Sequence, residues 1–285
     1  MFTFNAYRYN LLEPNQKNMF DLKTKEEHFN NLLIAIHKAK KEVFIHFGNK
    51  NILFHHSQLT DTIFLLQLAK EETFQKPTEG SEELLEVTDI RFPFIFIIVD
   101  VQRQILLIQE RTSIMTIESI VNRLEAHWTS KLSEYHIVFT IRPINDSNNF
   151  WDELKDAEQI EEFDVTLNAP NLFRGRFEAS KFVQEVYDEY NITDFTMRFR
   201  NKIGQLKVVK ENVEDLVKLA AAGAGEFALR IIDKGVKKTI KSIKWVVKKV
   251  YTVNRIEDLD VQQLENDLRE LDTLSEIDNE DGREL

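Results

Sequence analysis

The chain has 285 residues, of which 42% are hydrophobic, five are Pro and none is Cys. This length and composition predict one large or two ordinary hydrophobic cores, and the lack of Cys excludes disulfides, thiolate metal sites and a Cys nucleophile. The net charge of −11 hides an uneven distribution. Residues 198–255 hold fifteen Lys and Arg against five Asp and Glu, whereas residues 256–285 hold twelve Asp and Glu against two Arg.

No run of eighteen uncharged apolar residues occurs, and the first residues lack a basic segment followed by an apolar stretch. The sequence therefore predicts neither a membrane span nor a signal peptide, and the expected location is the cytoplasm.

The first half predicts an α+β unit from its alternating and helical apolar spacings. Strands are expected at residues 2–9, 43–47, 52–56, 63–68, 92–101, 104–109 and 136–142, and helices at 26–41 and 116–131. Residues 76–86, which contain Pro77 and Gly80, are expected to form a loop. The turn-forming residues 146–149 predict the boundary with a second unit.

The second half predicts the order β-α-β-β-α-β, which is the ferredoxin-like arrangement. Its strands are expected at residues 162–167, 194–200, 205–209 and 226–232, and its helices at 177–190 and 213–222. Gly223 and Gly225 are expected to end the second helix. The predicted fold is α+β, with two α/β-sandwich halves followed by a basic segment and an acidic C-terminal helix or tail.

Three regions follow from these patterns: an N-terminal domain at 1–147, a ferredoxin-like domain at 148–255 with a basic segment at 234–255, and an acidic tail at 256–285. Residues 234–250 fit either an amphipathic helix or strands. The tail has a stripe of leucines, Leu264, Leu268, Leu271 and Leu274, which predicts a helix before a disordered end. This helix is expected to fold over the basic block as an autoinhibitor, to mediate oligomerisation, or to remain solvated.

The basic block is the main functional signal, because clustered Lys and Arg attract polyanions. The primary nucleic-acid-binding candidates are Lys237, Lys238, Lys241, Lys244, Lys248 and Lys249. The second group comprises Arg174, Arg176, Arg198, Arg200 and Lys202. Other interpretations are that these cations solvate a packed element, bind an acidic protein or the chain's own tail, or contact an anionic membrane surface.

No catalytic residue, metal ligand or cofactor site is predicted. The seven His lack zinc-binding spacing, and the pair Arg123 and His127 on one expected helix is only a weak ribonuclease-like signal. A divalent-metal nuclease built on Asp89, Asp100 and Glu110 remains an alternative, although Asp100 is more simply explained as a cap of the turn that follows it.

Several segments together resemble uncharacterised bacterial phage-defence proteins of the phage-exclusion, or abortive-infection, type. They are residues 6–14, 92–109, 168–171, 174–176 and 201–225. The resemblance is one of layout and implies a two-domain α+β protein that binds DNA or senses a phage product, often without a catalytic site and with a partner. The acidic tail does not fit that pattern.

The resulting hypothesis is a non-catalytic nucleic-acid-binding component of a bacterial anti-phage defence or regulatory system. DNA is favoured over RNA as its ligand, and a protein partner and homo-oligomerisation are further expectations. The alternatives are an assembly subunit of a defence complex and a divalent-metal nuclease.

Overall fold

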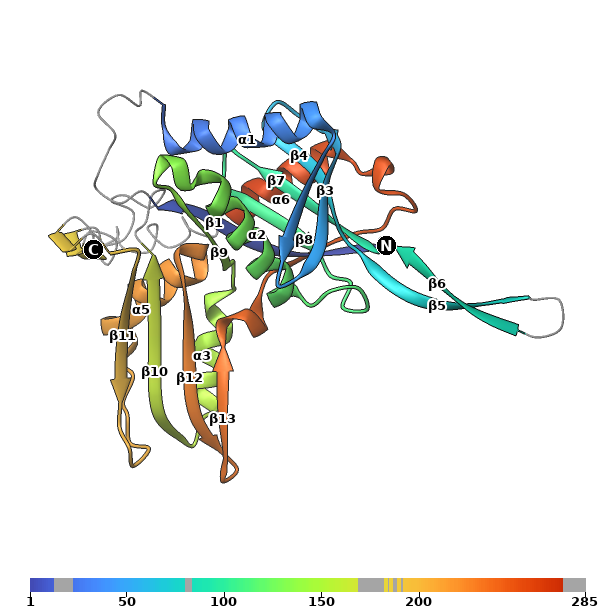
Figure 1. Cartoon of the computed structure of the whole chain (residues 1–285). Coiled ribbons are helices and arrows are strands. Elements are labelled where there is room, and N and C mark those ends of the chain that lie inside the picture. Colours follow the sequence, from blue (N-terminus) through green and yellow to red (C-terminus); the bar gives the residue numbers. More distant parts are fainter. Residues whose placement is uncertain are drawn as a thin grey trace.

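The computed structural model describes residues 1–12, 23–79, 84–168, 182–183, 185–186, 189–190 and 192–273. The fold is α+β, as predicted, with two antiparallel sheets and a two-stranded ribbon (Figure 1). Of the helices in these described ranges, none is long and apolar enough to cross a membrane.

The first sheet has eight strands in the order β14-β1-β8-β7-β4-β3-β2, and β9 also pairs with β1. The strands are β1 (Phe2–Leu12), β2 (Lys41–His46), β3 (Asn49–Gln58), β4 (Ile63–Lys70), β7 (Phe94–Asp100), β8 (Ile105–Gln109), β9 (Val138–Pro143) and β14 (Lys248–Tyr251). The long strand β1 pairs with three others, so it organises this sheet.

Helices α1 (Lys25–Ala39) and α2 (Ile117–Leu132) pack into the core on one face of this sheet. A capping box formed by Thr24 and Glu27 starts α1, and the Thr116 side chain caps α2. A short 3₁₀ turn, η1 (Ser133–Tyr135), follows α2. The predicted positions of both helices are thus confirmed to within two residues.

The opposite face is covered by the acidic helix α6 (Val261–Thr273), which follows the 3₁₀ turn η4 (Ile256–Asp258). Leu264, Leu268 and Leu271 are buried against first-sheet residues that include Phe4 and Leu65. The predicted helix is confirmed over these residues, and the three described leucines of its stripe are buried within the chain. Residues 274–285 lie outside the described part.

The second sheet has the order β11-β10-β12-β13, with every pair antiparallel. Its strands are β10 (Gln159–Asn168), β11 (Asp194–Arg200), β12 (Gly225–Asp233) and β13 (Val236–Lys241). Helices α3 (Ser147–Asp156) and α5 (Lys210–Leu219) supply apolar side chains to its core, as Phe150 and Val217 do. Of the helix predicted at 177–190, the described residues are helical and the others lie outside the described part.

This strand order differs from the ferredoxin-like prediction. A split β-α-β unit requires parallel strands separated by another strand, but β10 and β11 are direct antiparallel neighbours, with Val165 opposite Met197. The predicted strand at 205–209 forms only one bridge, between Gln205 and Ile160. Its apolar residues Leu206 and Val208 pack against the core without a ladder. Alternating apolar residues indicate a buried face, and they do not specify the pairing partner.

Two further segments differ from their predictions. The loop expected at 76–86 belongs largely to a ribbon of β5 (Glu72–Glu79) and β6 (Leu84–Arg91), which projects from the molecule in Figure 1. Both strands of a ribbon have a free edge, so Pro77 is tolerated there. The turn expected at 146–149 starts α3, because the Asp146 side chain accepts a hydrogen bond from the Asn148 backbone N–H.

The basic segment adopts strands, one of the two conformations left open by the sequence. It forms β13, the 3₁₀ turn η3 (Ser242–Trp245) and β14. Because β13 belongs to the second sheet and β14 to the first, the segment connects the two. A second connection is the π-helical turn η2 (Ala220–Ala224), where Asn145 N–H donates to the Ala221 carbonyl.

We expect Leu268→Ala to lower the free energy of unfolding by about 2–5 kcal/mol, because Leu268 on α6 is fully buried against the first sheet and the truncation leaves a cavity. Chemical denaturation monitored by circular dichroism measures this change. Gln263→Ala on the exposed side of the same helix is the control and should change stability by less than about 0.5 kcal/mol. Equal effects of the two substitutions would contradict the packing of α6 on the first sheet.

Candidate nucleic-acid interface

The six primary lysines do not form the single stripe that a helix would have produced. Five of them make ion pairs with carboxylates: Lys237 with Glu161, Lys238 with Asp233 at 2.6 Å, Lys244 with Glu153 at 3.2 Å, Lys248 with Glu110 at 2.8 Å, and Lys249 with Glu270 at 2.6 Å. Lys241 is exposed and makes no ion pair with any described residue. Most of these charges are therefore neutralised locally.

Lys249 on β14 is the lysine that the acidic helix covers. Its Nζ lies 3.1 Å from Asp267 and 2.6 Å from Glu270, and its side chain is only 13% exposed. Burial lowers the pKa of Lys249, but hydrogen bonds to Glu270 and Asp267 outweigh burial and raise it. Helix α6 therefore contacts one lysine of the predicted set and leaves those of β13 uncovered.

One face of the second sheet carries a concentration of cations. Helices α3 and α5 pack with the apolar side chains of the other face, and Figure 1 shows both helices behind the strands. We call the uncovered side the open face. Strand alternation and register place these residues on it: Glu162, Asp164, Thr166, Thr196, Arg198, Arg200, Glu226, Arg230, Lys237, Thr239 and Lys241.

Three guanidinium groups surround Glu162 on the open face. Its carboxylate lies 3.1 Å from Arg200 Nε, 3.4 Å from Arg230 Nη1 and 4.0 Å from Arg198 Nε. The Glu162 side chain is 7% exposed, whereas those of the three arginines are 40–60% exposed. One nearly buried carboxylate thus pairs closely with Arg200 and Arg230 and lies within 4.0 Å of Arg198, and all three arginines face solvent.

Arg198 has a second acidic partner on the neighbouring strand. Its Nε donates a 2.7 Å hydrogen bond to Asp164, and this bond raises the pKa of Arg198 further above its usual value. Asp164 and Arg198 are opposite each other across β10 and β11, as are Glu162 and Arg200. Cross-strand pairs of opposite charge stabilise this register.

The aromatic side chains of β11 point to the covered face. Phe199 stacks on Phe163 at 5.8 Å between ring centroids, and Phe195 contacts Phe182 at 5.6 Å. Met197 packs in the same core. The prediction that this strand is aromatic on one side and basic on the other is confirmed, and its aromatics belong to the core.

The remaining predicted cations lie elsewhere. Lys202 is exposed in the turn after β11, while Arg174 and Arg176 lie outside the described residues. Sequence reasoning missed Arg230 and the central role of Glu162. The alternation of Phe227, Leu229 and Ile231 with polar residues in the predicted strand was the signal that would have placed Arg230 with Arg198 and Arg200.

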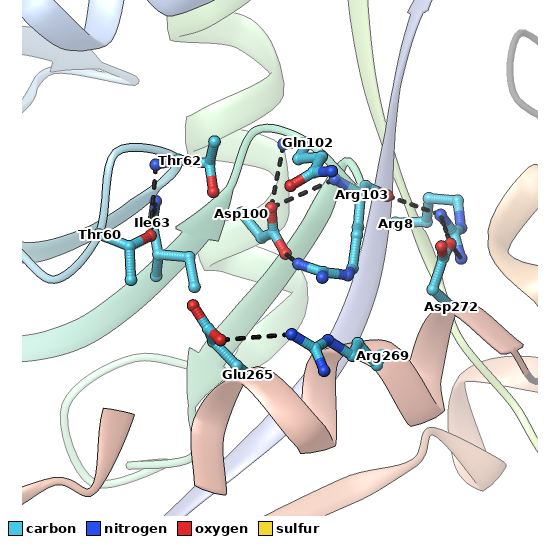
Figure 2. Close-up of polar contacts among 10 residues, drawn as sticks. All are labelled: Arg8, Thr60, Thr62, Ile63, Asp100, Gln102, Arg103, Glu265, Arg269 and Asp272. Carbon is cyan, nitrogen blue, oxygen red and sulfur yellow. Dashed lines mark hydrogen bonds and ion pairs between the residues drawn. The ribbon is translucent and has the colours of Figure 1, made fainter. Parts of the chain in front are cut away.

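The alternative nuclease residues are engaged in structural contacts. Asp100 is fully buried, and its Oδ1 accepts hydrogen bonds from the backbone N–H groups of Gln102 and Arg103 (Figure 2). Its Oδ2 pairs with Arg103 Nη1 at 2.7 Å, so Asp100 caps the turn as expected. Glu110 pairs with Lys248, and Asp89 lies on the ribbon.

The pair Arg123 and His127 is similarly buried. Arg123 donates to Asn51 at 2.7 Å, while the His127 ring stacks on Phe44 and lies 3.0 Å from Glu42. These contacts join α2 to β2 and β3. Within the described ranges, no three His, Asp or Glu residues gather in a way that would hold a metal ion.

No protein-family model matches the chain, and no curated protein matches it.

We expect Glu162→Gln to lower the free energy of unfolding by about 1–3 kcal/mol, because three guanidiniums lose the charge of their shared acceptor. Urea denaturation measures the loss, and added phosphate should restore part of it by replacing the missing negative charge. Glu153→Gln is the matched control, since among the described residues the ion-pair partner of Glu153 is the exposed Lys244. Equal losses in both variants, or no response to phosphate, would contradict the central role of Glu162.

Proposed function

We propose that this protein is a non-catalytic nucleic-acid-binding protein that contacts DNA, in preference to RNA, through the open face of its second sheet. The observation that carries this proposal is the group of three solvent-facing arginines that Glu162 and Asp164 hold together. Arg matches phosphate geometry well because its planar guanidinium presents five N–H donors.

Donors on the open face remain available for phosphate. The ion pairs with Glu162 and Asp164 engage Nε of Arg198, Nε of Arg200 and Nη1 of Arg230, and each guanidinium has further N–H groups. Lys237 and Lys241 add two ammonium groups, so five cations share the face with the ion-paired carboxylates Glu161, Glu162 and Asp164. Two further acidic residues of this face, Asp194 and Glu226, lie at its end nearest η2. The cationic surplus therefore lies toward the opposite end.

The chemistry of the open face favours a duplex over a single strand. Single-stranded ligands gain much of their affinity from bases that stack on aromatic rings. Phe195 and Phe199 pack in the core, and the open face offers cations and Thr hydroxyls. Four strands spaced about 4.8 Å apart form a surface about 15 Å wide, which suits contact with duplex phosphates.

We further propose a role in a bacterial anti-phage defence or regulatory system, supported by the resemblance in layout described above. The acidic tail is proposed to weaken binding electrostatically. Because α6 is part of the first core, a test of this effect must retain α6 and remove only residues 274–285, which contain five Asp and Glu.

We expect the triple variant Arg198→Gln, Arg200→Gln and Lys241→Gln to bind duplex DNA more weakly and with a smaller salt dependence. If three phosphate contacts are lost, the slope of log affinity against log salt should fall by about 2–3. Fluorescence anisotropy with labelled duplex DNA, single-stranded DNA and RNA across a salt series measures both changes. The control triple Lys38→Gln, Lys155→Gln and Arg255→Gln changes net charge equally but affects exposed residues outside the second sheet and outside β2.

The control triple should retain the wild-type salt slope. The chain that ends at Thr273 should bind more tightly than the full chain at low salt, because five acidic residues and one Arg, a net four negative charges, are removed. Absence of binding by the wild type at low salt, or an equal reduction in both triple variants, would contradict an interface on the open face.

A further inference from the structure

Strand β2 ends the first sheet and has an open backbone edge. It is joined to β3 by the two-residue turn Phe47–Gly48, in which both residues have positive φ. This turn makes His46 and Asn49 a hydrogen-bonded pair, and such pairs alternate along the hairpin. The backbone N–H and C=O of Phe44 therefore point toward β3, whereas those of Val43 and Ile45 point away from it, toward the open edge. No described residue forms a hydrogen bond with those outward groups.

The side chains of β2 leave this edge unprotected. Val43 is 50% exposed and Ile45 is 65% exposed, and strand alternation places both on the same side of β2, while Phe47 in the following turn is 91% exposed. Natural sheets protect free edges with charged side chains, especially Lys. The edge strand β13 follows that rule with three lysines and β14 has two, whereas the single lysine of β2 is its first residue, Lys41, and Val43 and Ile45 in its middle carry no charge.

We propose that β2 pairs antiparallel with β2 of a second copy, about a two-fold axis that passes beside Phe44. This register places Val43 opposite Ile45 of the second copy and Glu42 opposite its His46. Val43 and Ile45 both point their backbone groups outward, so each of the two symmetric Val43–Ile45 pairs exchanges two hydrogen bonds. The two first sheets become one continuous sheet.

A second copy is the occupant because the strand is complementary to itself in this register. Apolar Val43 meets apolar Ile45. The Glu42 carboxylate, which pairs with His127 and Lys131 of its own chain, lies opposite the imidazole of His46, so no like charges are opposed. Shifting one strand by two residues in either direction also keeps the outward backbone groups of the two strands opposite each other, but both shifted registers are less favourable. One shift places Glu42 opposite Phe44, and the other places Glu42 opposite Gly48, beyond the end of the strand.

This inference does not depend on nucleic-acid binding. The proposed two-fold axis places β2 of one copy against β2 of the other, in the first sheet, while the open face belongs to the second sheet. A dimer would present two open faces to one ligand, and the second contact would then form at a high effective concentration. The two proposals fail separately, because oligomeric state is measured without nucleic acid.

Sedimentation velocity over a wide range of protein concentration tests the pairing. We expect a wild-type dimer and at least about tenfold weaker dimerisation in Val43→Pro and in Ile45→Lys. Val43→Pro removes an outward N–H and no bond to β3, so the hairpin should persist, and circular dichroism checks that the fold is retained. Val236→Lys changes an equally exposed apolar residue on β13 and should leave the dimer intact.

Cross-linking tests the register. The chain contains no Cys, so the double substitution Val43→Cys and Ile45→Cys should yield a disulfide-linked dimer on oxidation, whereas Val236→Cys with Val250→Cys should not. A wild type that remains monomeric at every concentration would overturn the proposal. So would dimerisation that is unaffected by Val43→Pro and Ile45→Lys, or a lack of specific cross-linking.

Discussion

The buried guanidinium of Arg8 is the contact on which the arrangement of the two sheets depends. Its Nε donates to the Ala222 carbonyl at 2.8 Å, and its Nη1 donates to the Arg103 carbonyl at 2.7 Å. Both terminal nitrogens also lie 3.2 Å from Asp272 Oδ1, as Figure 2 shows. One side chain on β1 thereby joins the β7–β8 turn, η2 and α6. Burial of a charge is costly unless it is paired and hydrogen-bonded, so these partners must be placed together.

This requirement explains the small residues between α5 and β12. At Gly223, where φ is +91°, a Cβ would lie 2.4 Å from the Arg8 Cβ, so the close approach of η2 to β1 requires glycine. Asn10 adds a hydrogen bond from its side chain to the Gly223 carbonyl at 3.1 Å. Because β12 begins directly after η2, the same contacts determine where the second sheet leaves the first. The position of the open face is therefore a consequence of packing around Arg8.

Local patterns predicted most individual elements, but they could not predict their pairing. The spacing of Phe29, Leu33 and Ile36 identified α1, and the apolar run at 92–101 identified β7. The order of β10 and β11 depends on contacts such as Asp164 with Arg198, between residues 34 positions apart. Arg8 had no distinguishing signal in the sequence, because its burial depends on carbonyls supplied by distant turns. The candidate site was predicted in part, since Arg198, Arg200 and Lys241 lie on the open face, whereas Arg230 was missed.

The segregation of charge along the sequence does not persist on the surface. Lys237, Lys244 and Lys248 are paired with Glu161, Glu153 and Glu110, all of which come from the acidic first 197 residues. Folding thus neutralises much of a segment that is strongly cationic when only its sequence is considered. A local excess of positive charge remains where several cations share few carboxylates. The three arginines around Glu162 form such a place. The number of cations per available carboxylate on one face is therefore a better indicator of a polyanion site here than the number of lysines in a segment.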